Sequence, residues 1–246
     1  MKKTLFLVYA IVGYLIGQAS LLYIFGFLID LAVPKGISDG NQLSPLMASA
    51  IDLPLIMAFG LLHSIMARAS FKRWWTQFVP SPIERPTYLL VTAGATAALV
   101  WFWQPIPITI WHVEAHWGQV AFYGAYGLAW CMMLAATFHF GHFDFFGLAR
   151  AWTEFRKAPA ESKKMSIRFL YALVRHPISL GWMIMPFLTP HFTLGHLVFA
   201  VGVLAYVMAA TPFEEADLID ELGDEYRQYR KQVPAFLPYK KTGRPQ

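Results

Sequence analysis

The segment FHFGHFDFFGLAR at 138–150 combines titratable and aromatic side chains next to an apolar run. It holds His139, His142, Asp144 and Arg150, side chains of the kinds that exchange protons or bind ligands. An ionisable residue in or beside a membrane span is costly, so it is a functional candidate by default. The structural alternative is a loop at the membrane surface with interfacial phenylalanines. The candidate phenylalanines are Phe138, Phe140, Phe143, Phe145 and Phe146.

A basic pair, Arg175 and His176, stands at the start of another apolar run. Pro177 has no N–H group to leave unpaired in a first helical turn, so a helix is expected to begin there. The free N–H groups and partial positive charge of a helix N-terminus favour a carboxylate. Gly181, one turn later, allows a ligand or another helix to approach closely. The structural alternative is a snorkelling arginine and a capping histidine.

Two adjacent carboxylates, Glu214 and Glu215, follow the last apolar segment directly. An amphipathic helix at the cytoplasmic surface explains most of the stretch 211–239, including Tyr226. A carboxylate at the membrane surface is also suited to holding the ammonium group of a ligand. Together with the basic pair, it would suit a ligand with an amino-acid head, an adenine and a sulfonium, which aromatic faces attract.

The elements that must position these residues are membrane helices. Of the 246 residues, 57% are hydrophobic and 14% are charged, whereas a soluble domain has about 25% charged residues. Segments of roughly 20 apolar residues can cross the hydrocarbon core. We expect an all-α, polytopic integral membrane helical bundle of about five to six transmembrane helices. The expected spans are 5–29, 50–69, 87–106 and 118–138, followed by a helical hairpin over 178–211 that is broken at 189–196 and has a short first arm.

Basic residues alternate in number between the expected loops. Lys and Arg number two at the N-terminus, one in 30–49, four in 68–87, none in 104–117, seven in 139–177 and six in the C-terminal tail. Because basic loops stay in the cytoplasm, we expect a multi-pass protein of a bacterial inner membrane, in contact with lipid, with both termini cytoplasmic. This pattern accounts for the net charge of +5, and no nucleic-acid partner is expected. The scattered histidines and the absence of HExxH predict no metal site.

The C-terminal residues resemble the signature of the membrane methyltransferases, a superfamily that includes isoprenylcysteine carboxyl methyltransferase and the phospholipid N-methyltransferases. The resemblance implies that S-adenosylmethionine binds at the cytoplasmic ends of the last helices. The implied cofactor-binding residues are Tyr171, His176, Pro177, Gly181, Glu214, Glu215 and Tyr226. Two positions depart from the pattern. Ser179 replaces a frequent tyrosine, and Ala216 replaces the arginine that usually follows the two glutamates.

Five blocks in order along the chain resemble, more specifically, the methanethiol S-methyltransferases. They are LLHSIMAR (61–68), SPIERPTYLL (81–90), WQPIP (103–107), HFDFFGLAR (142–150) and RHPISLGW with TPHFTLGHLVFA (175–182 and 189–200). The resemblance implies transfer of a methyl group from S-adenosylmethionine to methanethiol, which yields dimethyl sulfide. We expect a single domain over 1–246, with the first four spans in 1–137 and the catalytic loop, hairpin and cytoplasmic C-terminal helix in 138–246.

Such a reaction needs the thiol to ionise. A thiol with a pKa of about 8.5 is only about 3% ionised at pH 7, so a base or a neighbouring cation would assist. We expect His142 or Asp144 to act as the base and Arg150 or Arg175 as the cation. Two alternatives remain: a methyltransferase that acts on a prenylcysteine carboxylate or a lipid amine, and a haem-binding isomerase or non-enzymatic membrane protein related to denitrification-associated proteins.

Overall fold

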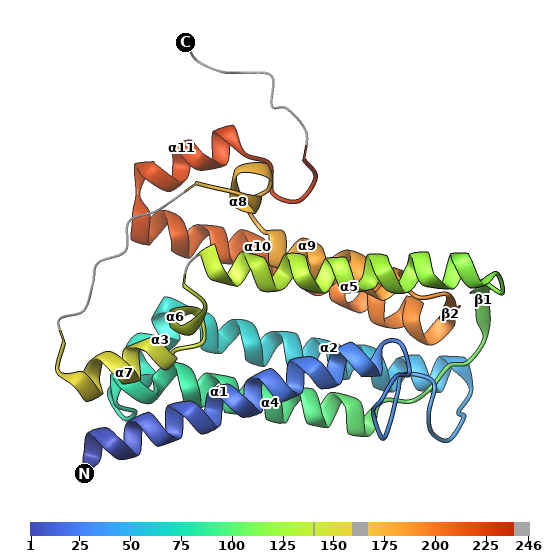
Figure 1. The fold of residues 1–246 in the computed structure, drawn as a ribbon, viewed down its shortest axis with the longest axis horizontal. Coiled ribbons are helices and arrows are strands. Elements are labelled where there is room, and N and C mark those ends of the chain that lie inside the picture. Colours follow the sequence, from blue (N-terminus) through green and yellow to red (C-terminus); the bar gives the residue numbers. More distant parts are fainter. Residues whose placement is uncertain (140, 159–166, 239–246) are drawn as a thin grey trace.

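The computed structural model describes residues 1–139, 141–158 and 167–238 (Figure 1). Phe140 of the aromatic segment and the stretches 159–166 and 239–246 lie outside the described residues. Long α-helices form the frame. They are α1 (Lys2–Phe27), α2 (Pro45–Ala67), α4 (Ser81–Phe102), α5 (His116–His139) and α10 (Leu194–Leu222).

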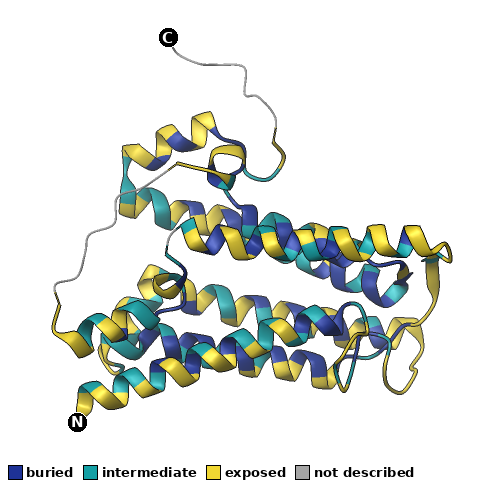
Figure 2. Ribbon diagram, in the orientation of Figure 1, coloured by how far each residue is buried: buried dark blue, intermediate teal, exposed yellow. Residues whose placement is uncertain are grey.

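Four of these helices, α1, α2, α5 and α10, are long and apolar enough to cross a membrane. The helix α4 has 22 residues and is also long enough, but its first turns carry the charged Glu84 and Arg85. Figure 2 shows exposed residues along the outer faces of the long helices, and many of them are large and apolar, such as Leu15, Trp101 and Leu128. Such a surface suits lipid contact. The expected all-α polytopic membrane fold is confirmed.

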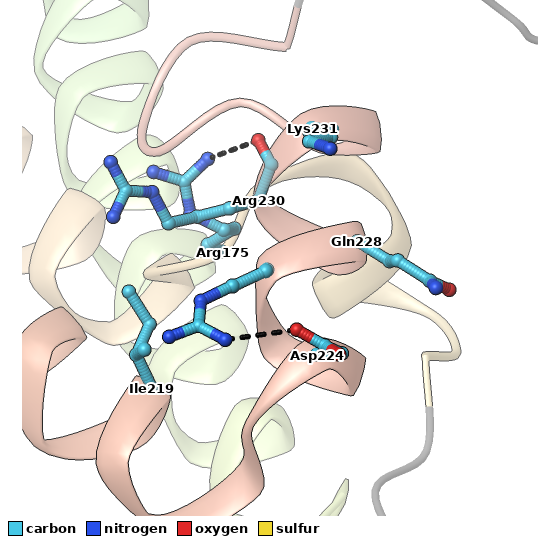
Figure 3. A pocket seen from close by; sticks show the side chains of 7 residues that line it. Arg175, Ile219, Asp224, Gln228, Arg230 and Lys231 are labelled. Atoms are coloured by element: carbon cyan, nitrogen blue, oxygen red, sulfur yellow. Dashed lines mark hydrogen bonds and ion pairs between the residues drawn. The ribbon is translucent and has the colours of Figure 1, made fainter.

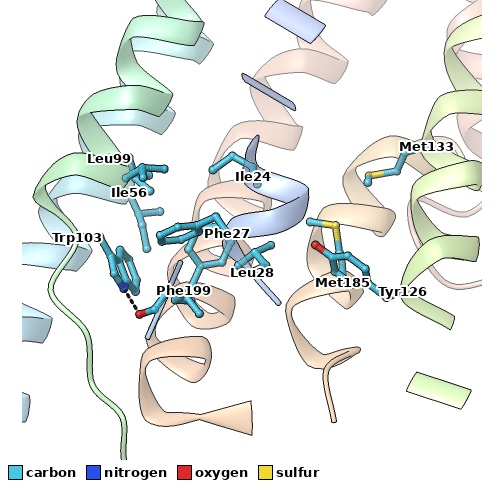
Figure 4. Packing of buried hydrophobic residues seen from close by; sticks show 12 residues of the cluster. Ile24, Phe27, Leu28, Ile56, Leu99, Trp103, Tyr126, Met133, Met185 and Phe199 are labelled. Carbon is cyan, nitrogen blue, oxygen red and sulfur yellow. Dashed lines mark hydrogen bonds between the residues drawn. The ribbon is translucent and has the colours of Figure 1, made fainter. Parts of the chain in front are cut away.

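The long helices form two layers (Figure 1). In one layer α4 packs between α1 and α2, and in the other α9 (Pro177–Ile184) packs between α5 and α10. Contacts between α2 and α10 join the layers, and the hydroxyl of Tyr126 donates to the Phe25 carbonyl over 2.7 Å to tie α5 to α1. The main apolar core includes Phe27, Trp103 and Phe199 (Figure 4). Within this core, Trp103 Nε1 donates a 3.1 Å hydrogen bond to the Ile37 carbonyl, which holds the indole in place.

The hairpin of α9 and α10 has a short first arm, as the sequence predicts. Pro177 begins α9, which confirms the expected helix start, and the 3₁₀ turn η1 (Met185–Phe187) ends the arm. The break contains a short strand, β2 (His191–Thr193), which pairs antiparallel with β1 (Thr109–His112). This ribbon lies at the end of the bundle opposite the N-terminus (Figure 1), and Trp111 stacks on Phe192 with ring centroids 3.9 Å apart.

The smaller helices gather at the other end of the bundle, where the N-terminus lies (Figure 1). They are α3 (Ala69–Trp75), α6 (His142–Phe145), α7 (Leu148–Arg156), α8 (Leu170–Leu173) and α11 (Asp224–Gln232). The expectation of one amphipathic helix over most of 211–239 is wrong. Instead, α10 continues through Pro212 to Leu222, and Gly223, with φ 61°, turns the chain into α11. Glu214 and Glu215 therefore belong to the same helix as the last span.

Candidate active site

A buried carboxylate, Glu215, lies near the C-terminal end of α10 and organises the residues around it. Its side chain is 8% exposed. Its Oε1 accepts hydrogen bonds from Arg175 Nε at 2.8 Å and from His176 Nε2 at 3.0 Å, and its Oε2 lies 3.2 Å from Arg230 Nε. A buried charge is tolerated when it is paired and hydrogen-bonded in this way. Ala216, which departs from the expected arginine, is exposed, and the counter-charges come from Arg175 and Arg230.

Arg175 also holds the segment that follows α11. Its guanidinium donates to the carbonyls of Arg230 and Val233, while its backbone N–H donates to the Pro234 carbonyl at 2.9 Å. The next backbone N–H, of His176, donates to the Ala235 carbonyl at 3.1 Å. The guanidinium predicted as a cation for the thiol is therefore engaged with Glu215 and with backbone carbonyls, and it positions the C-terminal segment against the start of α9.

The neighbouring carboxylate, Glu214, is in a different environment. Its side chain is 57% exposed, and its Oε2 lies 3.7 Å from Nδ1 of the buried His176. Burial raises the pKa of Tyr171 on α8 and of Tyr226 on α11, and the charge of Glu214 adds to both shifts. An accessible carboxylate among tyrosines matches an ammonium and a sulfonium ligand in charge and in aromatic character.

Tyr171 links this cluster to the end of α5. The Tyr229 hydroxyl donates to the Tyr171 carbonyl over 2.7 Å, and burial raises the pKa of Tyr229 to about 12, so the donor proton is retained. The Tyr171 ring stacks on His139, with ring centroids 4.8 Å apart. Burial also raises the pKa of Tyr171. The predicted position 171 therefore joins the C-terminal cluster to the aromatic segment that follows α5.

The aromatic segment forms a compact turn around His142. Gly141 and Gly147, with φ 81° and 79°, bracket the short helix α6, and these left-handed conformations suit glycine. His142 is only 7% exposed. Its ring lies 4.7, 4.9 and 5.4 Å from those of Phe138, Phe146 and Phe143, respectively. Burial lowers the pKa of His142, so the neutral imidazole is favoured.

The structure separates the other predicted residues of this segment from the His142 ring. Asp144 is exposed on the same short helix, and residues two apart on a helix do not face one another. Arg150 is exposed on α7, and its side chain makes no hydrogen bond or ion pair to the described part of the chain. Gly181 faces Met133 of α5, and a Cβ there would meet its side chain. This glycine thus permits helix packing, one of the two uses that the sequence suggested.

Both ring nitrogens of His142 have partners that sequence reasoning missed. Nδ1 lies 2.7 Å from Thr137 Oγ1, and Nε2 lies 2.8 Å from the Tyr14 hydroxyl. Tyr14 is 128 positions away in the chain. Its place as a polar residue within the first expected span, in the stretch LVYAIVGYLIG, was the available signal, but nothing local pairs it with His142.

Arg85 connects the aromatic turn to Tyr88 of α4. Its Nε donates to the Phe145 carbonyl at 2.9 Å. Its guanidinium lies 5.1 Å from the ring centroid of Tyr88 and 5.5 Å from that of Phe145. The aromatic turn and Tyr88 therefore meet at the first turns of α4. The sequence places Arg85 in one of the five blocks but assigns it no role.

A cavity of about 680 Å³, which shares Arg175 and Arg230 with the Glu215 cluster, lies between the end of α10 and α11 (Figure 3). Its lining is mainly cationic and consists of Arg175, Ile219, Asp224, Arg227, Gln228, Arg230 and Lys231. None of these seven residues is aromatic, so the cavity offers no face for an adenine or a sulfonium. The tyrosine cluster at Glu214 is the better match for the predicted cofactor. Within the described residues, no group of three or more His, Cys, Asp or Glu side chains is placed to hold a metal ion.

The fold and the site define a polytopic helical membrane protein with its polar site at one end of the bundle. The chain is 39% identical to a methanethiol S-methyltransferase of Mycobacterium tuberculosis, over 97% of this chain and 98% of that protein. It is 37% identical to one of Crocosphaera subtropica, over 97% of this chain and 94% of that protein. A more distant match is Nurim of Danio rerio, at 26% identity over 69% of this chain and 64% of that protein.

No family model matches the chain, and no solved structure matches it. The two long matches nevertheless cover nearly the whole of both proteins in each pair. The chain belongs to the methanethiol S-methyltransferase family, and the resemblance identified from the five blocks is confirmed.

Proposed function

We propose that this protein transfers a methyl group from S-adenosylmethionine to methanethiol and releases dimethyl sulfide. The observation that carries the proposal is the exposed Glu214 carboxylate, 3.7 Å from Nδ1 of the buried His176, in a chain of this family. A methyltransferase needs a methyl donor. The Glu214 carboxylate and the neighbouring tyrosine rings would suit a methyl donor that carries both an ammonium and a sulfonium.

The predicted cofactor-binding residues divide into two groups. Glu214 would pair with the ammonium, while Tyr171 and Tyr226 would offer aromatic contacts. Buried Glu215, with His176, would hold this arrangement in place, and Pro177 and Gly181 would set the start and the close packing of α9. When bound, S-adenosylmethionine would supply an electrophilic methyl group on a sulfonium.

The thiol would bind on the side of the aromatic turn. Methanethiol offers no carbonyl or amide for recognition, so a small apolar pocket must select it. The phenylalanines packed around His142 would supply such a wall. Asp144 and Arg150 stay predictions for assistance to the thiol. For Arg175, the bonds to Glu215 and to two carbonyls support a positioning role.

We further propose that both termini lie in the cytoplasm of a bacterial cell and that the site opens to that side of the inner membrane. The argument is the distribution of basic residues, which favours the cytoplasmic side. The N-terminus and the helices α3, α7 and α11 lie at the site end of the bundle, while the loops with one and no basic residue lie at the end with β1 and β2 (Figure 1).

The test of the proposed reaction is direct. Purified protein incubated with methanethiol and S-adenosylmethionine should release dimethyl sulfide into the headspace, as measured by gas chromatography. A prenylcysteine and a lipid amine, offered in parallel, should not be methylated at a comparable rate. A folded protein that methylates either of these and leaves methanethiol untouched would contradict the proposal.

A further inference from the structure

The hydrogen bonds around His142 fix the direction of its proton. Thr137 Oγ1 lies 2.7 Å from the Leu134 carbonyl oxygen, which can only accept, so the single hydroxyl proton of Thr137 is donated there. The contact of 2.7 Å between Thr137 Oγ1 and His142 Nδ1 then requires a proton on Nδ1. In the neutral imidazole, Nε2 is therefore the acceptor. It receives the Tyr14 hydroxyl proton over 2.8 Å.

His142 has no ring nitrogen left for a substrate. Nδ1 is committed to Thr137, Nε2 to Tyr14, and the ring is buried among phenylalanines. Tyr14 itself is only half-buried. Of the hydrogen-bonded pair, Tyr14 is thus the more accessible residue, while His142 is buried.

Tyr14 also lies next to Tyr88 of α4. It packs against the buried cluster that contains Met66, Tyr88 and Phe146. Arg68, two residues after Met66, pairs at 3.2 Å with Asp217, which lies one turn after Glu214 on α10. The Tyr14 phenol therefore belongs to the wall between the aromatic turn and the carboxylate assigned to the cofactor. A thiol bound in this wall has a proton acceptor on one side and the proposed methyl donor on the other.

We propose that Tyr14, and not His142 itself, accepts the proton of the thiol substrate, while its own proton passes to His142. This inference rests on the proposed function. The thiol S–H bond breaks as an O–H bond forms on Tyr14, and the former Tyr14 proton forms an N–H bond on His142 Nε2. The thiolate sulfur forms a bond to the donated methyl group, and the electron pair of the broken S–CH₃ bond stays on the donor sulfur. The imidazolium later returns its proton to water through the same phenol.

The surroundings of His142 suit this positioning role. An imidazolium with both N–H groups donated and three phenylalanine rings within 5.4 Å is stabilised by hydrogen bonds and by the aromatic faces. The titratable groups on its own and adjoining elements are His139 of α5, Asp144 of α6, Arg85 of α4, which bonds to the Phe145 carbonyl, and Arg150 and Glu154 of α7. Burial lowers the pKa of His142, so the imidazole is neutral at rest and the imidazolium is a transient carrier of the proton.

Tyr14→Phe tests the relay, and Tyr9→Phe is the matched control. Tyr9 lies on the same helix, and its hydroxyl also bonds across to another helix, 3.1 Å from Thr87 Oγ1. Both variants lose one hydroxyl and one interhelical hydrogen bond, so similar small decreases in melting temperature are expected. Tyr14→Phe alone should lower kcat for methanethiol at pH 7 by roughly 100-fold, and the loss should shrink toward pH 9.5 as the thiol ionises unaided.

Two further readouts separate a relay from a structural contact. Methaneselenol is nearly the same size as methanethiol but is ionised at neutral pH, so Tyr14→Phe should methylate it at close to the wild-type rate. In the cofactor-free protein, ¹⁵N-histidine NMR should show His142 protonated at Nδ1, and Tyr14→Phe should shift its Nε2 resonance, whereas Tyr9→Phe should not.

An equal loss for both substrates at every pH, or a His142 protonated at Nε2 alone, would overturn the relay. So would unchanged methanethiol turnover in Tyr14→Phe. If the wild-type protein produces no dimethyl sulfide, the proposed function fails instead, and the NMR experiment still decides the direction of the hydrogen bond.

Discussion

Glu215 on α10 and Arg175 before α9, 40 positions apart in the chain, form a buried ion pair, with Arg175 Nε 2.8 Å from Glu215 Oε1. Each side chain is 8% exposed. Because Arg175 also holds the carbonyls that follow α11, this pair joins the last span, the start of the hairpin and the C-terminal segment. These contacts fix the surroundings of the adjacent Glu214, whose carboxylate remains accessible.

Glu215→Gln should destabilise the protein strongly. Removing one charge leaves Arg175 buried without its partner, and breaking a buried pair in this way costs about 3–5 kcal/mol. Thermal unfolding in detergent measures the effect. Asp224→Asn is the matched control because its pair with Arg227 is exposed, so a change within about 0.5 kcal/mol is expected. Equal melting temperatures for the two variants would show that the buried pair does not organise the site.

Glu214→Gln should weaken S-adenosylmethionine binding without unfolding the protein. We expect a loss of at least roughly tenfold, or about 1.4 kcal/mol, because the neutral amide cannot pair with an ammonium. His176→Ala should weaken binding by a similar factor. Calorimetric titration gives both values, with Glu225→Gln, an exposed acidic residue on α11, as the control. Native affinity in both site variants would exclude the tyrosine cluster as the cofactor site.

Tyr229 predicts an alkaline limit to stability. Burial raises the pKa of this phenol to about 12, above the value near 10 expected in the unfolded chain. The folded state thus retains a proton that the unfolded state loses, so this contribution is present below about pH 10 and is lost as the pH rises toward 12. Tyr229→Phe should be less stable at pH 7, since the bond to the Tyr171 carbonyl is gone, but should lose less stability between pH 10 and 12. Parallel wild-type and variant curves across that window would refute the assignment.

Topology reporters test the orientation. A reporter fused after Gln246, which lies outside the described residues, should register the cytoplasm, and one inserted near Val113 should register the outside. The expectation follows from the counts of basic residues in the loops. A cytoplasmic signal at Val113 would reverse the orientation and place the site on the opposite side of the membrane.

The spans and the start of the hairpin could be predicted because local physics determines them. Apolar runs need helices in lipid, and Pro177 suits a first helical turn. The continuation of α10 through Pro212 could not be read locally, since a proline usually weakens a helix interior. The sequence also did not predict the contact of Arg230 with Glu215 or that of Tyr14 with His142. In each contact the two residues lie on different helices, and only the packing of those helices brings the side chains together.

The central claim is that this chain moves a methyl group from a sulfonium to methanethiol. The most direct measurement uses S-adenosylmethionine with a trideuterated methyl group, unlabelled methanethiol and purified protein, followed by headspace mass spectrometry. The account predicts dimethyl sulfide that carries one trideuterated and one unlabelled methyl group, formed in equal amount with the demethylated cofactor. Folded wild-type protein that forms no labelled dimethyl sulfide, or that forms only unlabelled product, would contradict it.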